Sequence, residues 1–269
     1  MGIDAGSGGR VRSLSGDKRG FMEKVSVVMP AFNTADYIEY AINSVLSQTY
    51  ANFHLYIIDD ASTDATGDVV QRFTDDPRVT YYRNERRLGR AETINMGIDM
   101  AAGEFIAFCD SDAVWEKNKL FTQVNILQTK RYDMVCSHYA TFLNSVNKLT
   151  RTYKSREIIT YRDLLRGHRI ADITGMYNQA RLGKVYLENV PHQEYLMWLS
   201  LLKRAKGTMA YCIPETLAYC RISPRQSFLS KNPFDSWQWR IYRDYLRLPY
   251  YKSFYYYLSS LAQAMKRIV

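Results

Sequence analysis

Short apolar segments alternate with longer segments of helical period from Val25 onward. Strands are predicted at Val25–Met29, Phe53–Ile58, Val79–Tyr82, Glu104–Cys109 and Met134–Ser137. Helices are predicted between them, at Asp36–Gln48, Thr66–Phe73, Ala91–Ala102 and about Lys117–Gln128. This alternation indicates βαβ units, and therefore an α/β fold with a mostly parallel central sheet flanked by helices.

The pattern is weaker at both ends of the chain. Residues 1–24 hold six of the fourteen glycines and show no hydrophobic period, which is typical of a flexible leader or a tag. Beyond Phe142 the signal fades until Glu194–Arg204, which again predicts a helix. No internal repeat or low-complexity tract is present.

Composition excludes several classes of protein. Hydrophobic residues make up 46% and charged residues 23% of the 269 residues, close to the average of soluble globular chains. No apolar run reaches the roughly 18 residues of a membrane span, and no secretory signal is seen, so a cytoplasmic location is expected. The cysteines are widely spaced and are expected to be small core residues rather than zinc ligands or disulfides: Cys109, Cys136, Cys212 and Cys220.

The net charge of +9 is concentrated at the C-terminus. Residues 221–269 carry nine Lys and Arg against two Asp, and they hold twelve of the 37 aromatic residues. The remaining 220 residues therefore carry only +2. Such a basic aromatic segment favours a role separate from that of the nearly neutral body.

Polar residues gather where the predicted strands end. The first strand delivers Pro30, Phe32 and Asn33, the second is followed by Asp59–Asp64, and the fourth by Asp110–Asp112. Ligands of open α/β sheets bind beyond the carboxyl ends of the strands. Asp110 and Asp112, with Ser111 between them, could face one Mg²⁺ or Mn²⁺ and the diphosphate that it bridges. The alternative is two solvated turn aspartates or helix caps.

Two further groups suit a nucleotide. Asp60 could accept the ring N3–H of a pyrimidine while Phe32 stacks on the base, although Phe32 could equally be a core aromatic. The loop after the third strand holds Arg83, Arg86, Arg87 and Arg90, which form either a solvated face or a diphosphate site. Arg87 and Arg90 are the stronger candidates, and Asp64 is expected to cap the next helix.

Taken together, these motifs closely resemble the family 2 glycosyltransferases. The resemblance rests on VSVVMPAFN (25–33), AINSVLSQTY (41–50), IIDDASTD (57–64), GEFIAFCDSD (103–112) and WEKNKLFTQ (115–123). It runs over about residues 25–128, with weaker similarity at 172–202 and 219–230. It implies the Rossmann-like GT-A fold, with a nucleotide-sugar-binding half at 25–130 and an acceptor-binding half at 131–230.

The resemblance also implies an activity and its residues. A sugar, a hexose or an N-acetylhexosamine, would move from a nucleotide diphosphate donor to an acceptor hydroxyl, with inversion at the anomeric carbon. Phe32 and Asp60 would contact the base, Asp110 would lie near ribose and metal, and Asp112 would ligand Mn²⁺ or Mg²⁺. Glu194 falls on the catalytic-base position, and His192 is a second choice. The alternative is a purely structural role for Glu194, as an acidic residue at the start of a helix, where the helix dipole favours negative charge.

Three departures from the family pattern affect these assignments. The chain has Ala113 where a third acidic residue is common, and Thr93-Ile94-Asn95 where Ala-Arg-Asn is common. The usual Glu-Asp pair before the apolar helix is Gln193-Glu194 here. The first two departures are expected to alter substrate contacts, and the third leaves the base less firmly assigned than the metal ligands.

The segment 231–269 predicts a basic aromatic helical extension. In Trp237–Leu248 three arginines share one helical face, and Trp237, Ile241, Tyr245 and Leu248 line another. This pattern favours a helix on an anionic membrane surface, and the alternative is two helices packed on the catalytic domain. Together with this pattern, the resemblance to bacterial family 2 glycosyltransferases implies a UDP-sugar enzyme of O-antigen, capsule or lipopolysaccharide synthesis that acts on a lipid-linked glycan at the inner face of the plasma membrane.

Other classes of function remain as alternatives. A nucleotide-sugar-binding module without catalysis is compatible with Ala113 and Gln193. A nucleic-acid-binding protein would use the basic tail, but the nearly neutral body argues against nucleic acid as a partner. A dinucleotide-dependent dehydrogenase is disfavoured because no G-x-G-x-x-G follows the first strand.

Overall fold

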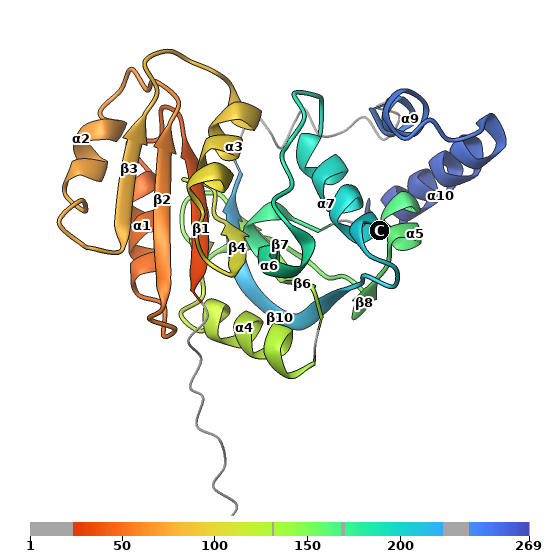
Figure 1. Ribbon diagram of the computed structural model, residues 1–269, viewed down its shortest axis with the longest axis horizontal. Coiled ribbons are helices and arrows are strands. Elements are labelled where there is room, and N and C mark those ends of the chain that lie inside the picture. Colours follow the sequence, from red (N-terminus) through yellow and green to blue (C-terminus); the bar gives the residue numbers. More distant parts are fainter. Residues whose placement is uncertain (1–23, 131, 168–169, 223–236, 269) are drawn as a thin grey trace, which may run out of the picture.

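The computed structural model describes residues 24–130, 132–167, 170–222 and 237–268. One sheet runs through the molecule in the strand order β3-β2-β1-β4-β9-β6-β10-β5, with β7 paired to β6 and β8 paired to β10 (Figure 1). Because β6, β9 and β10 continue the sheet that β1–β4 begin, the two predicted halves of the domain share one sheet. The predicted leader at 1–24 lies outside the described residues except for Lys24.

The first half of the sheet is parallel. It consists of β1 (Val25–Ala31), β2 (Phe53–Asp59), β3 (Val79–Arg83) and β4 (Phe105–Phe108). Every residue of β1 is buried, and its side chains alternate between two hydrophobic clusters, with Val27 and Met29 in one and Val28 in the other. β2 and β4 are buried almost throughout as well, and a strand buried on both faces has a continuous apolar sequence, which explains why these three strands are visible in the sequence.

Helices cover both faces of the sheet (Figure 1). On one face, the first cluster takes residues from α1 (Ile38–Leu46), α2 (Thr66–Gln71) and α4 (Lys119–Thr129). On the other, the second cluster takes residues from α3 (Arg90–Met100), α5 (Tyr161–Leu165) and α7 (Gln193–Arg204). The predicted helices of the first half and the predicted helix 194–204 are therefore present, with ends that differ by a few residues.

The second half of the sheet is mixed. Its long strands are β6 (Met134–Phe142) and β10 (Ala210–Arg221), which pair in parallel, and β9 (Met176–Asn178) lies antiparallel between β4 and β6. The remaining elements are short: β5 (Val114–Trp115), β7 (Leu149–Tyr153), β8 (Ile158–Ile159), η1 (Asp172–Thr174) and α6 (Gln179–Leu182). Of the strands in the second half of the sheet, the sequence predicted only the start of β6.

The C-terminal segment differs from its prediction. The prediction of one continuous helix over Trp237–Leu248 is wrong. The helix α9 (Trp237–Arg240) is followed by a π-helical turn, η2 (Ile241–Tyr245), and Arg247 has a φ of 50°. Trp237 and Ile241 are buried in the second cluster with Tyr242, so they are not available to an outside surface. A separate helix, α10 (Tyr250–Ile268), follows at the far right of Figure 1.

The cysteines follow their prediction. All four are free thiols, with Cys109, Cys136 and Cys212 buried and Cys220 half-buried. Within the ranges that the structure describes, none of the helices combines the length and apolar character of a membrane span.

Candidate active site

The parallel register brings three strand ends together. Ala31 of β1 lies opposite Asp59 of β2, so the following residues Phe32 and Asp60 emerge side by side. On the other side of β1, Val28 pairs with Phe108 of β4, and the amide of Cys109 donates to the Val28 carbonyl at 3.0 Å. The segment Asp110–Asp112 therefore emerges next to Pro30, as the sequence pattern predicted.

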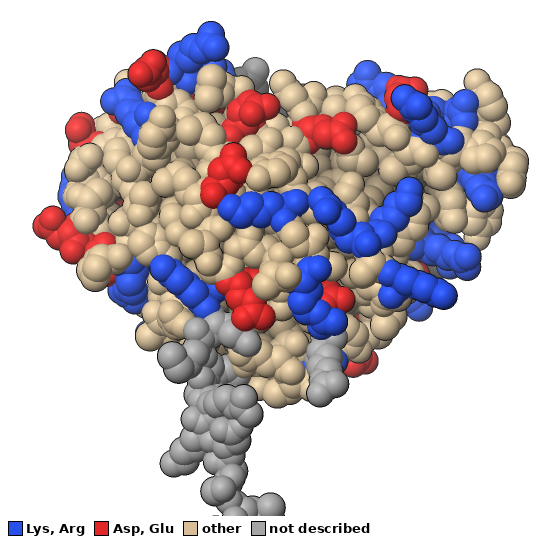
Figure 2. All heavy atoms as spheres, viewed as in Figure 1, with Lys and Arg blue, Asp and Glu red and all other residues tan. Residues whose placement is uncertain are grey.

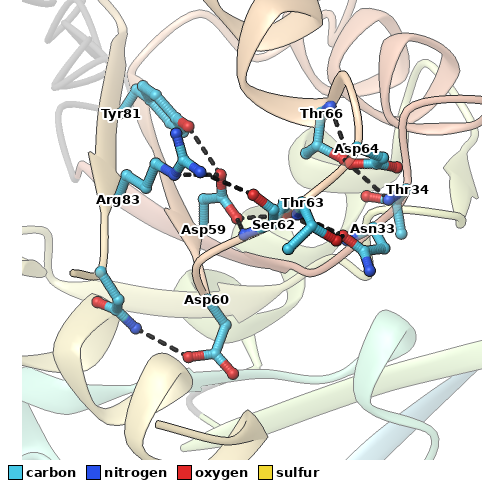
Figure 3. A network of polar contacts seen from close by, with 11 residues as sticks. Asn33, Thr34, Asp59, Asp60, Ser62, Thr63, Asp64, Thr66, Tyr81 and Arg83 are labelled. Carbon is cyan, nitrogen blue, oxygen red and sulfur yellow. Dashed lines mark hydrogen bonds and ion pairs between the residues drawn. The ribbon is translucent and has the colours of Figure 1, made fainter. Parts of the chain in front are cut away.

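Asp59, the last residue of β2, has a structural role (Figure 3). The Asp59 side chain is fully buried and accepts hydrogen bonds from the amide and hydroxyl of Ser62, at 2.9 and 2.5 Å, and from the hydroxyl of Tyr81 at 2.8 Å. The Arg83 Nε lies 3.8 Å from its Oδ2. Arg83 is therefore committed to Asp59 and to the Ser62 carbonyl rather than to a ligand.

Asn33 and Asp64 join the loops after β1 and β2 (Figure 3). The Asn33 Oδ1 accepts from the Thr63 amide at 2.8 Å, and Asp64 accepts from the amides of Ala35 and Thr66 at 3.1 and 3.0 Å. Asn33 has a φ of 50°, the left-handed conformation that Asn tolerates better than most residues. Its side chain thus fixes the loop that presents Phe32.

Asp60 points away from this network and fixes the arginine loop (Figure 3). Its carboxylate accepts from Asn84 Nδ2 at 3.0 Å and from the amides of Leu88 and Gly89 at 2.7 and 2.9 Å. Burial raises the pKa of Asp60, but these hydrogen bonds outweigh burial and hold the pKa below its ordinary value. Gly89 has a φ of 93°, so the turn that begins α3 requires glycine here.

These loops enclose a cavity of about 430 Å³, here named the strand-end cavity, which is large enough for a nucleotide. Eight of the predicted site residues line it: Pro30, Phe32, Asp60, Arg87, Arg90, Asp110, Ser111 and Asp112. Asn33 and Glu194 do not line it, whereas Thr34, which the sequence did not single out, and Thr93, one of the departures from the family pattern, do.

Phe32 and Arg87 face each other in this cavity. The Arg87 guanidinium lies 4.1 Å from the centre of the Phe32 ring, a cation–π contact. Phe32 is partly exposed and lines the cavity, so part of its ring is open to a ligand. A base that stacked on the ring would replace or share the contact with Arg87.

Arg90 joins the two halves of the domain. One terminal nitrogen donates to Asp110 Oδ1 at 2.7 Å, and its Nε donates to Glu194 Oε1 at 2.7 Å. Asp110 raises the pKa of Arg90 against the opposing effect of burial, and Glu194 raises it further. The structure thus brings Glu194, from the first turn of α7, beside the carboxylates that follow β4, 84 residues earlier in the chain.

A second, smaller cavity continues from this ion pair. It is lined by Pro30, Arg90, Ile94, Phe108, Asp110, Asp172, Leu187, Glu194 and Met197 and is here named the inner cavity. The alternative base, His192, stacks on Trp237 with 3.9 Å between ring centres and lines neither cavity. Of the two candidates for a base, only Glu194 therefore adjoins the strand-end residues.

Asp172 is the acidic residue that the sequence did not single out. Its Oδ1 accepts from the indole Nε1 of Trp198 at 2.7 Å, and it lines the inner cavity. Burial raises the pKa of Asp172 to about 8, and Glu194 and Asp110 raise it as well. Gly175 permits this contact, because a Cβ there would lie 2.3 Å from the Trp198 ring. Asp172 and Trp198 are 26 residues apart, and no sequence pattern predicts a contact between residues at that spacing.

The carboxylates after β4 fit a divalent cation. Asp110 and Asp112 offer hard oxygen ligands in one cavity, and burial, followed by the charge of Asp110, raises the pKa of Asp112 to about 6. Burial and the neighbouring Asp110 carboxylate both disfavour the charged form of Asp112, and a bound cation would favour that form. Within the described part of the chain, no group of three or more His, Cys, Asp or Glu side chains is placed to hold a metal. Phosphate and water would therefore supply the remaining ligands.

A third cavity, of about 780 Å³ and here named the side cavity, adjoins the strand-end cavity at Asp112. Its other walls come from the start of α1, with Tyr37 and Tyr40, from the turn after β6, and from Arg221. Arg221 lies over the Tyr37 ring at 4.4 Å and donates to the carbonyl of Leu143 at 3.0 Å. This side cavity is larger than the strand-end cavity but carries fewer acidic groups.

Comparison of the sequence with known proteins identifies relatives over almost the whole chain. Residues 26–186 match the model of glycosyl transferase family 2. A putative teichuronic acid biosynthesis glycosyltransferase, TuaG of Bacillus subtilis, is 31% identical over 90% of this chain and 96% of its own length. WfgD of Escherichia coli, named a UDP-Glc:alpha-D-GlcNAc-diphosphoundecaprenol beta-1,3-glucosyltransferase, is 32% identical over 90% of this chain and 94% of its own length.

Solved structures agree with the fold. The S. aureus TarS fragment 1–349 in complex with UDP-GlcNAc is 20% identical, with a TM-score of 0.66 over 82% of this chain and 64% of that chain. The mannosyltransferase PcManGT from Pyrobaculum calidifontis, in complex with GDP-Man and Mn²⁺, is 18% identical, with a TM-score of 0.63 over 91% and 75%. The predicted GT-A fold is confirmed, and the extent of the sequence match shows that this chain belongs to glycosyl transferase family 2.

Proposed function

We propose that this protein is an inverting, metal-dependent glycosyltransferase that uses a UDP-sugar. It would transfer a hexose or an N-acetylhexosamine to a hydroxyl of a lipid-linked glycan in bacterial surface polysaccharide synthesis. The observation that carries the proposal is the contact of Arg90 with both Asp110 and Glu194, because it places a candidate base next to the candidate diphosphate site. The names of WfgD and TuaG support the donor and acceptor classes.

The donor would bind in the strand-end cavity. Phe32 would stack on the base, and Asp60 would hold the arginine loop in place and face the base edge. Asp112 and Asp110 would hold Mn²⁺ or Mg²⁺, which would neutralise the charge of the departing diphosphate. Arg87 and Arg90 both line the cavity, and their guanidinium groups are suited to phosphate oxygens.

Glu194 would act on the acceptor. Its Oε1 is held by Arg90, which leaves Oε2 to accept the proton of the acceptor hydroxyl. The hydroxyl oxygen would form its bond to the anomeric carbon as the bond from that carbon to the diphosphate breaks. Because attack and departure occur on opposite faces, the anomeric configuration inverts. Arg90 thus couples the base to the carboxylates on the leaving-group side.

The proposed acceptor also assigns a location. A lipid-linked glycan is held in a membrane, and we infer that the protein meets it as a peripheral protein at the inner face of the plasma membrane, where its basic C-terminal segment favours anionic lipid.

A thermal-shift panel tests the donor assignment. The protein is heated with UDP, GDP, dTDP or CMP, each with and without Mn²⁺. A ligand that binds only the folded state adds about 2.7 kcal/mol at a hundred times its dissociation constant, which is easily measured. The proposal predicts metal-dependent stabilisation by UDP above the other nucleotides. Stabilisation by GDP alone, or by no nucleotide, would contradict the donor class.

A further inference from the structure

Helix α10 carries its apolar face outward. The side chains of Tyr250, Tyr251, Phe254, Tyr255 and Leu258 are 49–71% exposed. At about 100° per residue these five positions lie on one side of the helix, here named the outer face of α10. A surface helix ordinarily turns such a face to the core, so α10 is reversed.

Packing fixes the opposite side of the helix to the domain. Ser253 and Ser260 are buried, and a Cβ on Gly167 would lie 2.8 Å from the Cα of Ser260. Tyr256 and Tyr257 contact the rings of Tyr242 and Trp239, with 6.2 and 5.9 Å between ring centres. The side of α10 that carries the two serines and these two tyrosines therefore faces inward, and the helix cannot roll to bury its outer face without losing these contacts.

We infer that the outer face of α10 lies in the headgroup region of an anionic bilayer. Tyr and Phe suit this region because their rings are apolar and the Tyr hydroxyl stays hydrated. The helix contains no Asp or Glu, and Lys252, on the flank of the outer face, is exposed. Residues 237–269 carry six basic residues against Asp244 alone.

Charge decides between a bilayer and a second copy of the chain. Two outer faces placed together would bring the Lys252 flanks close without any carboxylate from α10 to pair them. In Figure 2, basic side chains surround tan surface at the end of the molecule where Figure 1 places α9 and α10. Anionic lipid headgroups complement this arrangement, at about 1 kcal/mol per basic residue near the surface.

The part of the tail that would touch the membrane is therefore α10 rather than the predicted segment Trp237–Leu248. Trp237 and Ile241 are buried against the domain, and of the predicted face of Trp237–Leu248 Tyr245 is exposed, so α10 supplies most of the exposed apolar side chains in the described part of the tail. The inference rests on the proposed function in one respect: a lipid-linked acceptor is the reason for the enzyme to bind a membrane.

Vesicle flotation of the full-length protein tests the inference. Vesicles of phosphatidylglycerol with phosphatidylcholine are compared with vesicles of phosphatidylcholine alone. Wild-type protein should float mainly with the anionic vesicles. The variant Phe254→Asp with Leu258→Asp should bind them at least about tenfold more weakly. It removes two apolar groups that the bilayer would bury, and it adds negative charge beside the anionic headgroups. Phe121→Asp on α4, where Phe121 is 45% exposed, is the matched control and should float like the wild type.

Two results would overturn the inference. One is equal flotation of the double variant and the wild type. The other is a dimer, detected by light scattering, that the double variant dissociates, since the outer face would then be covered by a second copy. Stabilisation of the double variant by UDP with Mn²⁺ should equal that of the wild type, so a failed membrane contact is distinguishable from a failed donor assignment.

Discussion

The loops after β1 and β2 hold their polar residues through a dense local network, whereas Glu194 is held by a single arginine from the other half of the chain. Asp59 has hydrogen bonds from Ser62 and Tyr81, and Asp60 has three from the segment 84–89. Glu194 has one bond, from Arg90 across 104 residues. The proposed donor side is therefore preorganised, and the position of the proposed base depends on how the two halves meet.

Loss of the base should give the largest effect on turnover. Glu194→Gln keeps the size of the side chain but cannot accept the hydroxyl proton, so turnover should fall by about 10²–10⁴. Stabilisation by UDP with Mn²⁺ should remain, because Glu194 does not line the strand-end cavity. Initial rates with saturating donor measure the first effect, and thermal shift the second. Undiminished turnover would place the base elsewhere, with Asp172 the next residue to test.

Removal of the link between the halves should come next. Arg90→Ala frees Glu194 and Asp110 from each other, and a base misplaced by about 1 Å can cost roughly 100-fold in rate. Arg90→Lys keeps the charge but cannot contact both carboxylates in the same way, so it should recover only part of the rate. Full recovery by lysine would show that charge alone, and not the bridging geometry, matters at this position.

Removal of the metal ligand should weaken donor binding. Asp112→Ala should lower the affinity for UDP in Mn²⁺ by at least about tenfold, because an anionic oxygen is lost from a two-carboxylate site. Isothermal titration with and without Mn²⁺ measures this change. Asp36→Ala, in the wall of the side cavity, is the matched control. Unchanged metal-dependent affinity in Asp112→Ala would remove Asp112 from the metal site.

The smallest effect on turnover should come from the donor-side network. Tyr81→Phe removes one hydrogen bond to the buried Asp59 and should lower the free energy of unfolding by about 1.5–3 kcal/mol. Denaturant unfolding measures this loss, and turnover at low temperature should stay within about twofold of the wild type, because the other bonds to Asp59 remain. A large loss of turnover in a folded Tyr81→Phe protein would show that the network shapes the site more directly.

The sequence predicted what local pattern encodes. The strands β1, β2 and β4 are buried on both faces, so their apolar runs are visible, and their ends place Phe32, Asp60 and Asp110 beside one cavity. The partners of Asp60 follow it by 24 to 29 residues in one βαβ unit. The placement of Glu194 came from resemblance rather than from pattern.

The second half was less predictable because its contacts are distant in sequence. The strand β9 pairs with both β4 and β6 although it has only three residues, and Asp172 reaches Trp198 through space left by Gly175. In the tail, the apolar pattern of Trp237 and Ile241 showed an amphipathic segment but not which side would be covered. The burial of Ser253 and Ser260 and the ring contacts of Tyr256 and Tyr257 show which side of α10 faces the domain.

A crystal structure of the Glu194→Gln variant with a UDP-sugar and Mn²⁺ tests the central claim most directly. The account predicts the uracil on Phe32, the diphosphate beside Asp110 and Asp112, and the anomeric carbon facing residue 194 at the inner cavity. A donor bound in the side cavity, with its anomeric carbon turned away from residue 194, would contradict it.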